Sequence, residues 1–431
     1  MLISAKLNSG EVITEEKYIF NKIKIMRQIV NYFTDNDLYT FTCQYYVLQT
    51  YPRAEVRYSF FDRNHTKYPE GFGKLLQEQI DGMKDVVITE AEIAFMKSKI
   101  YFLPDWYYDF LRGYRFNPSE VHIFQDQSGY LSITIEGKWY STIMWEMPIL
   151  STISELMHII NGDIDKVNWE YEYKKAYEKG VKAFTNGLLL SDMGTRRRFD
   201  FHNQSVVLKA LKDAYESLGD KASGKLVGTS NVWFAKEYEL TPIGTMSHQI
   251  VCAEECVSGV FECNYQVMDK WSKCFNGDVG IYLPDAFGHA VFFDNFSKRL
   301  AKTFDGLRID SGDEKEETEK IIEKYRSLGI DPSIKAIVYS NALTIDKAIV
   351  LHEWLNGRMK DSYGIGTHLC ADVTNMETGA PFPYSNIVIK LIGFRITELR
   401  KWQDAVKLSN DKGKTLGNQE KCMYLIKSIN G

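Results

Sequence analysis

The chain has 431 residues, of which 44% are hydrophobic and 25% are charged, and this balance is typical of a globular protein that buries a full core. Its formal net charge of −5 provides no overall positive field, which argues against nucleic acid or an anionic membrane as partner. The first residues, MLISAKLNSGEVITEEKY, lack the long uncharged stretch of a signal peptide or a membrane span. The 7 cysteines form no CxxC pair, so we expect reduced thiols and a cytoplasmic protein.

Residues 1–145 are predicted to form an α+β domain. Helical stretches alternate there with strand-like ones, of which 55–61 (EVRYSFF) and 130–135 (YLSITI) show the alternation of a half-buried strand.

A second domain is predicted over 146–390. Residues 145–190 carry apolar side chains at helical spacing, which indicates helices that lead into a new unit. Near the C-terminus, 392–415 returns to a basic, strand-like pattern. We therefore expect 391–431 to join the first domain.

Within 146–390 one pattern recurs: a short apolar strand, a polar turn that contains Gly or Ser, and a helix. The turns lie at 228–231 (GTSN), 244–248 (GTMSH), 285–288 (DAFG), 308–313 (RIDSGD), 340–342 (SNA) and 364–367 (GIGT). Such repeats indicate parallel strands joined by helices, hence an α/β fold. In a (β/α) barrel all of these turns would surround one pocket, whereas a doubly wound open sheet would gather only the loops at its switch point. We favour the barrel.

Three short segments carry groups suited to an anionic ligand. Residues 194–198 (GTRRR) place three guanidinium groups beside a glycine, although a solvated basic turn has the same composition. Residues 308–313 offer carboxylates that can accept hydrogen bonds from ribose hydroxyls and stabilise a cationic sugar, or that can simply close a surface turn. Residues 364–367 offer backbone amides and a hydroxyl for phosphate, or form an ordinary loop.

His248 follows a Gly-Thr turn where a helix is expected to begin. A histidine there can act as acid, base or phosphoryl acceptor, although a lone histidine is more often structural. His248, Cys252 and Cys256 share one helical face, but no fourth ligand accompanies them, so we expect no metal ion held by protein side chains. Neither GxxxxGK[ST] nor a GxGxxG in a βαβ setting is present.

Taken in order, these segments resemble the nicotinate phosphoribosyltransferase family over most of the chain. The matching pieces are 34–39 (TDNDLY), 193–200 (MGTRRRFD), 227–249 (VGTSNVWFAKEYELTPIGTMSHQ), 304–313 (FDGLRIDSGD), 339–343 (YSNAL), 364–370 (GIGTHLC) and 406–414 (VKLSNDKGK). The resemblance implies a type II phosphoribosyltransferase fold: an irregular (β/α) barrel with a smaller α+β domain built from both chain ends. It also implies a homodimer with sites near the interface.

The resemblance assigns the catalytic roles to three residues. His248 corresponds to the histidine that ATP phosphorylates, and turnover of that phosphohistidine drives nucleotide formation. Asp310 corresponds to the carboxylate that holds the ribose hydroxyls, and Arg308 to an arginine that contacts nicotinate.

Further residues are implied to bind the two substrates. Tyr39 lines the nicotinate pocket in the family, contributed across a dimer interface. Thr245 corresponds to a further nicotinate contact, and Arg196 to an arginine beside the pyridine and phosphate sites. The implied 5′-phosphate cradle consists of Gly366 and Thr367, with Ser340 and Asn341 as weaker candidates.

Three positions depart from the pattern of the family. Met193 stands where many relatives have a phenylalanine that stacks on the pyridine, although a thioether can also pack on a ring. Gln249 replaces a common glutamate, which leaves the orientation of the histidine ring open. Asn410 replaces an aspartate, which we expect to be a minor structural change.

The resemblance implies an enzyme that makes nicotinate mononucleotide and pyrophosphate from nicotinate and phosphoribosyl pyrophosphate in NAD salvage, with Mg²⁺ and with ATP as co-substrate. A nicotinamide phosphoribosyltransferase is the nearest alternative. Its relatives carry an aspartate where this chain has Ser230, and an aspartate would repel a carboxylate. A non-catalytic barrel that binds nucleotides through 196–198 is the alternative from another class.

Overall fold

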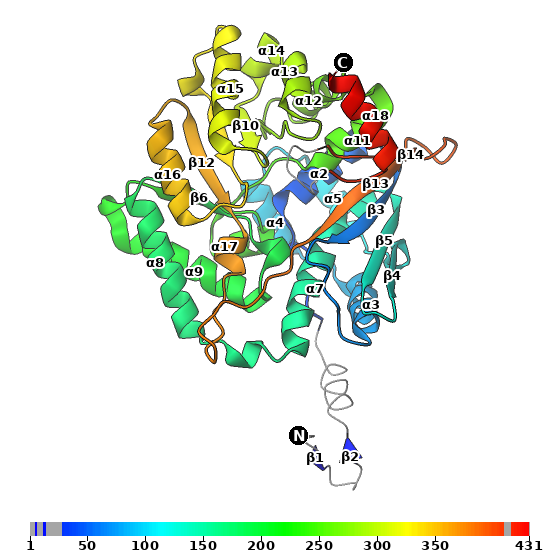
Figure 1. Ribbon diagram of the computed structural model, residues 1–431, viewed down its shortest axis with the longest axis vertical. Helices are drawn as coiled ribbons and strands as arrows, with labels where there is room; N and C mark the ends of the chain where they lie inside the picture. The colour runs from blue at the N-terminus through cyan, green and yellow to red at the C-terminus, as the bar shows by residue number, and fades with distance from the viewer. Residues whose placement is uncertain (1–4, 7–11, 14–27, 409–414, 431) are drawn as a thin grey trace.

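The computed structural model describes residues 28–408 and 415–430, together with the backbone of the short strands β1 (Ala5–Lys6) and β2 (Val12–Ile13), which pair in antiparallel fashion (Figure 1). Asn410 lies outside the described residues. Among the helices described here, none combines the length and the apolar character needed to cross a membrane.

The larger sheet is parallel and has seven strands in the order β8-β7-β6-β12-β11-β10-β9. Its strands are β6 (Leu189–Asp192), β7 (Lys225–Thr229), β8 (Thr241–Pro242), β9 (Ile281–Tyr282), β10 (Gly306–Ile309), β11 (Ala336–Tyr339) and β12 (Lys360–Ile365). The first strand, β6, pairs with the last, β12, so the order follows the sequence around a circle. This pairing is that of a barrel, and the predicted irregular (β/α) barrel is confirmed.

The irregularity lies between β8 and β9, which follow each other in the sequence. No ladder joins these two strands in the described part of the chain. The hydroxyl of Thr245, just after β8, donates a hydrogen bond of 2.7 Å to the carbonyl of Ile281 in β9. A side chain therefore crosses the gap that backbone pairing leaves open.

The smaller sheet is antiparallel, in the order β14-β13-β3-β5-β4. Its strands are β3 (Glu55–Asp62), β4 (Val121–Gln125), β5 (Leu131–Lys138), β13 (Ile387–Arg395) and β14 (Gln403–Asp404). The expected packing of the C-terminal segment on the N-terminal strands is confirmed, because β13 pairs with β3 along its length. The returning strand begins at Ile387, ahead of the expected residue 391.

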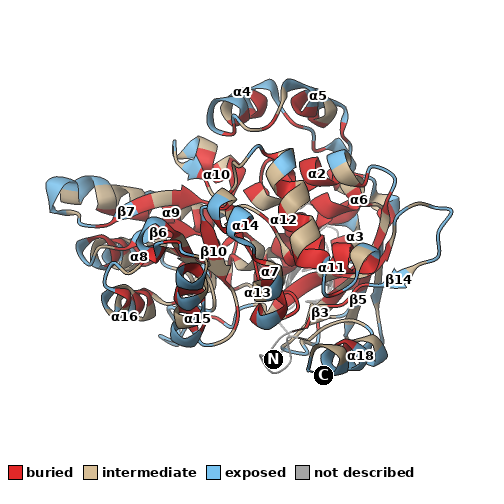
Figure 2. Cartoon of the chain, turned by 90° about the horizontal axis from the view of Figure 1, so that it is seen from above, coloured by how far each residue is buried: buried red, intermediate tan, exposed pale blue. Residues whose placement is uncertain are grey.

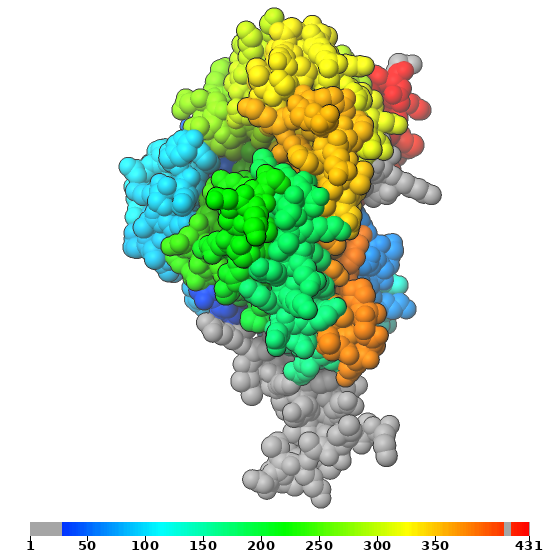
Figure 3. Space-filling view, turned by 90° about the vertical axis from the view of Figure 1, so that its left-hand side faces the viewer, coloured from blue at the N-terminus to red at the C-terminus, as the bar shows by residue number. Residues whose placement is uncertain are grey.

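Helices surround both sheets and bury their inner faces (Figure 2). They are α2 (Leu38–Thr50), α3 (Phe72–Gly82), α4 (Glu90–Lys99), α5 (Asp105–Gly113), α6 (Trp139–Thr142), α7 (Glu146–Ile160), α8 (Trp169–Thr185), α9 (Phe201–Leu218), α10 (Val232–Glu237), α11 (His248–Ser258), α12 (Cys263–Cys274), α13 (His289–Asn295), α14 (Lys298–Thr303), α15 (Glu314–Ser327), α16 (Ile345–Leu355), α17 (Thr367–Cys370) and α18 (Gln419–Asn430). One continuous apolar core joins the two sheets, with Leu190 and Ile337 from the barrel and Val56 and Phe394 from the smaller sheet. In Figure 3 the green to orange segments of the barrel fill the centre of one face, with blue and cyan N-terminal segments at its edges.

A buried ion pair fastens the N-terminal segment to the barrel. Arg198, after β6, donates two hydrogen bonds of 2.7 and 2.8 Å to the carboxylate of Asp35, just before α2. Both side chains have an exposed fraction of 0%. Because neither charge can reach water, each depends on the other for its compensation.

We expect Asp35→Asn to destabilise the fold, because it leaves the Arg198 guanidinium buried without its counter-ion. The expected loss is roughly 3–5 kcal/mol in the free energy of unfolding, measured by urea denaturation. Glu398→Gln is the matched control, because it removes the partner of Arg53 from a pair of which both members are exposed. A denaturation midpoint for Asp35→Asn equal to that of Glu398→Gln would contradict the structural role of the pair.

Candidate active site

A cavity of about 800 Å³ opens at the carboxyl ends of the barrel strands. Its floor comes from the turns after β6, β10, β11 and β12, and its opposite wall comes from the smaller sheet, through Arg63 after β3 and through Val388 and Lys390 in β13. An inner recess of about 100 Å³ adjoins it. The two hollows share Arg196, His248, Arg308, Asp310, Lys390, Lys407 and Leu416. Four of the predicted turns, 244–248, 308–313, 340–342 and 364–367, therefore meet at one pocket, whereas no residue of 228–231 or 285–288 belongs to the lining.

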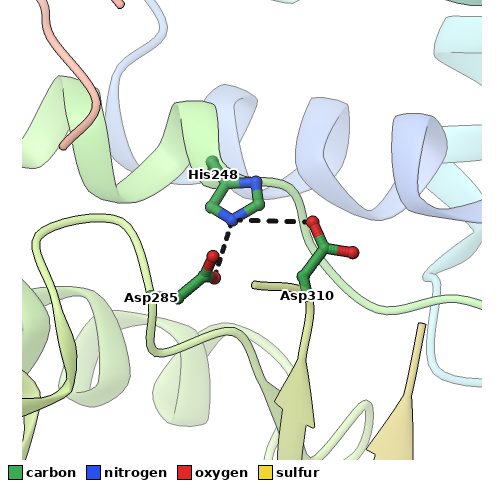
Figure 4. Close-up of side chains that lie close together, drawn as sticks. All are labelled: His248, Asp285 and Asp310. Atoms are coloured by element: carbon green, nitrogen blue, oxygen red, sulfur yellow. Dashed lines mark hydrogen bonds and ion pairs between the residues drawn. The ribbon is translucent and has the colours of Figure 1, made fainter. Parts of the chain in front are cut away.

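His248 begins α11 at this pocket, and its ring is held by charged neighbours (Figure 4). Its Nε2 atom lies 2.7 Å from Oδ1 of Asp285, 3.9 Å from Oδ2 of Asp310 and 2.9 Å from Nζ of Lys407. The second oxygen of Asp285 accepts hydrogen bonds from Ser311 at 2.6 Å and from Lys407 at 3.2 Å. Asp285 and Lys407 therefore fix the orientation of the His248 ring, which the replacement of a common glutamate by Gln249 had left open.

Gln249 itself faces away from the cluster. Its side-chain oxygen accepts hydrogen bonds from the hydroxyl of Tyr58 and from the indole of Trp139. The glutamine therefore links the start of α11 to the smaller sheet. Neither of these two hydrogen bonds involves the imidazole of His248.

Burial sets the protonation of this cluster. Burial lowers the pKa of His248 below its ordinary value, and the Asp285 carboxylate offsets only part of the effect. Burial alone would raise the pKa of Asp285, but His248 and Lys407 hold it well below the ordinary range. Near neutral pH the ring is uncharged and Asp285 is a carboxylate, so the imidazole keeps a lone pair for a nucleophilic step.

The cluster of one histidine and two aspartates around His248 has the composition of a metal site. Ligand atoms of His248, Asp285 and Asp310 lie within 4.8 Å of one another. The ammonium of Lys407 already contacts two of these three residues and supplies the positive charge that an ion would bring. The arrangement fits a cationic side chain, and we assign no metal ion to it.

Arg308, Asp310 and Ser340 form a triangle at the ends of β10 and β11. Arg308 donates to Oδ1 of Asp310 at 2.8 Å and to the hydroxyl of Ser340 at 2.7 Å, while Ser340 donates to the same Asp310 oxygen at 2.8 Å. Burial alone would raise the pKa of Asp310, but Arg308 and His248 hold it below the ordinary range. Asp310 is therefore ionised, and its other oxygen faces His248.

The basic segment 194–198 divides into two parts. Arg196 and Arg197 line the cavity, while Arg198 turns into the core to pair with Asp35. Of the three guanidinium groups of this segment only two therefore face the cavity, because the side chain that follows the turn at Thr195–Arg197 enters the interior.

Two arginines that line the cavity have a nitrogen atom that is unpaired within the described part of the chain, and one of them, Arg63, was not singled out in the sequence. The Nε atoms of Arg63 and Arg197 are buried and have no hydrogen-bond partner among the described residues. Burial lowers the pKa of both guanidinium groups, and repulsion from Arg196 adds to the effect. Lys390 and Lys407 were missed as well. Arg63, Lys390 and Lys407 lie in or beside the smaller sheet, far from the barrel turns that drew attention in the sequence.

The glycine turn after β12 lies against Met193. A Cβ atom on Gly366 would come within 2.5 Å of the Met193 carbonyl oxygen, and one on Gly364 within 2.4 Å of its sulfur. Only glycine leaves room for Met193 to rest across this turn and line the cavity. Gly366 and Thr367 line the same end of the cavity, and their role as a phosphate cradle stays a prediction.

Comparison with known proteins agrees with this geometry. The nicotinate phosphoribosyltransferase (NAPRTase) family model matches residues 188–428, and the model of the NAPRTase N-terminal domain matches 34–154. The chain belongs to the nicotinate phosphoribosyltransferase family. It is 36% identical to a nicotinate phosphoribosyltransferase of Desulforapulum autotrophicum over 92% of this chain and 97% of the relative. It superimposes on the crystal structure of the Porphyromonas gingivalis nicotinate phosphoribosyltransferase with a TM-score of 0.88 and 34% identity, covering 94% of this chain and 100% of the other.

The family resemblance implies that Tyr39 is contributed across a dimer interface, and this expectation stays a prediction. Tyr39 lines the recess of its own chain, together with Arg196 and Arg308. Its hydroxyl donates a hydrogen bond of 2.9 Å to Glu146 at the start of α7. The ordered segment that precedes α2 delivers the tyrosine in cis, because the Asp35–Arg198 pair holds this segment on the same barrel.

Two expected ligand contacts lie beside the cavity, behind its lining. The hydroxyl of Ser230 donates a hydrogen bond of 2.8 Å to buried Asp37, and that of Thr245 is bonded to Ile281. Neither residue belongs to the lining of the two hollows. Their assigned roles in recognition of the base stay predictions.

We expect Arg63→Met and Arg197→Met each to weaken binding of inorganic pyrophosphate by about 10-fold, because each removes one charge-assisted donor from the cavity. Isothermal titration calorimetry measures the affinity. Arg53→Met, on an exposed arginine outside the cavity, serves as control. Unchanged affinity in both cavity variants would refute anion binding by this pair.

The position of Tyr39 can be tested by complementation. We expect a mixture of Tyr39→Ala and His248→Ala chains, denatured and refolded together, to show no more activity than the two separate variants, because each site already carries one lesion. Recovery of activity on mixing would require a site shared between two chains and would contradict the placement in cis.

Proposed function

We propose that the protein transfers the phosphoribosyl group of phosphoribosyl pyrophosphate to nicotinate, giving nicotinate mononucleotide and pyrophosphate. The observation that carries the proposal is the charge of the cavity. Six cationic side chains line it, with only two aspartates: Arg63, Arg196, Arg197, Arg308, Lys390 and Lys407 against Asp310 and Asp372. Such an excess fits a ligand with several negative charges, as a phosphoribosyl pyrophosphate and a carboxylate together provide.

The reaction breaks the bond between the anomeric carbon and the pyrophosphate oxygen and forms a bond from that carbon to the pyridine nitrogen. Positive charge grows on the ribose, and the ionised Asp310 stabilises it while accepting hydrogen bonds from the ribose hydroxyls. Arg63 and Arg197 hold the departing pyrophosphate, with Mg²⁺ brought by the phosphates themselves. The pyridine nitrogen needs no general base, because it attacks through its own lone pair.

ATP coupling is proposed to act through His248. Burial keeps the ring neutral, which is the form that can attack the terminal phosphate of ATP. In this step a nitrogen-phosphorus bond forms, the bond between the β and γ phosphates breaks, and ADP leaves. The ammonium of Lys407, 2.9 Å from Nε2, would stabilise the charge of the phosphoryl group that is added. Hydrolysis of the phosphohistidine then returns the neutral ring.

Nicotinamide is the less favoured base. The positive cavity offers a neutral amide no electrostatic gain, and Ser230 places a hydroxyl beside Asp37 where the amide-specific relatives carry an aspartate. An aspartate there would add a second buried carboxylate next to the first.

We expect His248→Ala to lose ATP stimulation while retaining slow ATP-independent transfer, because Asp310 and the cationic side chains remain in place. Product formation is measured with and without ATP, and transfer of the labelled terminal phosphate of ATP to the protein is followed in parallel. His122→Ala, at an exposed position of β4, is the control. Phosphorylation or ATP stimulation that persists in His248→Ala would exclude the phosphohistidine.

A further inference from the structure

The inner recess has the dimensions and walls of a site for a flat ring. It measures about 100 Å³. Its apolar wall is formed by Met246, Leu283, Ile389 and Leu391, and Tyr39 and Tyr58 add two aromatic rings. An aromatic ring that enters from the main cavity would bury its faces against these groups.

Four cations border the recess, and they differ in what already holds them. Arg308 is bound to Asp310 and Ser340, and Lys407 to Asp285 and His248. Within the part of the chain that the structure describes, Arg196 and Lys390 make no hydrogen bond and no ion pair, and both line the recess as well as the cavity. Lys390 extends from β13 of the smaller sheet, and Arg196 from the turn after β6, so the two approach from different sheets.

The same recess contains a carboxylate of the protein. Glu146 is buried, lines the recess and accepts a hydrogen bond from Tyr39 through Oε2. Among charged groups Glu146 has the largest effect on the pKa of Lys390, so the two side chains lie close enough to interact electrostatically. An incoming carboxylate would be repelled by Glu146 unless a nearby cation offsets that charge.

We propose that Lys390 binds the carboxylate of the pyridine base in the inner recess and thereby selects an acid over an amide. The proposal rests on the proposed function, since it names a specificity-determining residue for that reaction. The phosphate groups are served by other donors, at the Gly366 turn and at Arg63 and Arg197, which do not line the recess. Of the two recess cations whose side chains have no partner in the described part of the chain, Lys390 is the one carried by β13, the strand that also supplies Ile389 and Leu391 to the lining.

The charge of Lys390 gives the role a pH signature. Burial lowers the pKa of Lys390 to about 8, with Glu146 opposing this effect and with Arg196 and Lys407 adding to it. A lysine is cationic below its pKa, so attraction for a carboxylate is strongest well below pH 8 and is lost progressively as the pH rises through about 8. Other groups around it keep their charge in this range: Asp310 is ionised far below it, His248 is already neutral, and burial raises the pKa of Tyr39 and Tyr58 well above the ordinary value.

The test compares Lys390→Met, which keeps the length of the side chain without its charge, with Lys390→Arg, which keeps the charge. For Lys390→Met we expect a rise of about 10- to 100-fold in the KM for nicotinate, with little change in the KM for phosphoribosyl pyrophosphate. Glu146→Gln added to Lys390→Met should recover part of the loss, because it removes the repelling carboxylate. Lys360→Met, at the exposed amino end of β12, is the control and should match the parent.

The pH profile provides a second measurement that does not depend on the methionine variant. In the parent the KM for nicotinate should rise above about pH 8, whereas in Lys390→Arg it should stay level because the guanidinium keeps its proton. Identical profiles in the two proteins would overturn the proposal even if Lys390→Met did not fold.

The remaining outcomes separate the alternatives. A rise confined to the KM for phosphoribosyl pyrophosphate would assign Lys390 to a phosphate and overturn the carboxylate role. An unchanged KM for nicotinate in a folded Lys390→Met would do the same. A parent protein that forms no nicotinate mononucleotide would instead refute the proposed function itself.

Discussion

The pairing of β6 with β12 is the constraint on which the site depends. It brings the first and last strands of the larger sheet together, so that turns separated by more than a hundred residues end on one side of a curved wall. The smaller sheet then covers this side, because β13 pairs with β3 and carries Lys390 toward the strand ends. The cavity is therefore a product of two sheets, neither of which encloses it alone.

The second constraint is electrostatic. Concentrating several cations around a partly buried hollow opposes folding, because each guanidinium or ammonium loses water and faces its neighbours. Burial and repulsion lower the pKa of Arg63, Arg197 and Lys390, which is the local sign of that cost. The protein offsets part of it where it can, as in the triangle around Asp310 and in the contact of Lys407 with Asp285. The remaining cations are available to a ligand.

Much of this arrangement could be predicted from sequence because it is local. The apolar runs and polar turns of the barrel are contiguous motifs, and each of the six predicted turns follows a strand of the parallel sheet. His248, Asp310 and Gly366 were found in this way, since each belongs to a turn whose composition indicates its chemistry.

The rest depends on contacts that a linear pattern does not contain. Arg196 and Arg198 are two positions apart in the same run of three arginines. Arg196 lines the cavity, whereas Arg198 pairs with Asp35 in the core. Arg63 follows β3 and Lys390 lies in β13, and both reach the cavity only because the smaller sheet covers the strand ends of the barrel. Ser230 was chosen for its chemistry, but its hydroxyl donates to Asp37 and the residue is absent from the lining of both hollows.

The wall formed by β13 also determines at which stage of synthesis this pocket can form. Arg63 emerges from the ribosome before the barrel turns, and Lys390 and Lys407 emerge after them. A nascent chain that has completed every strand of the barrel still has an open hollow with no lysine beside His248. Binding of a charged substrate in this pocket is thus deferred until β13 and the segment that carries Lys407 have followed the barrel strands out of the ribosome.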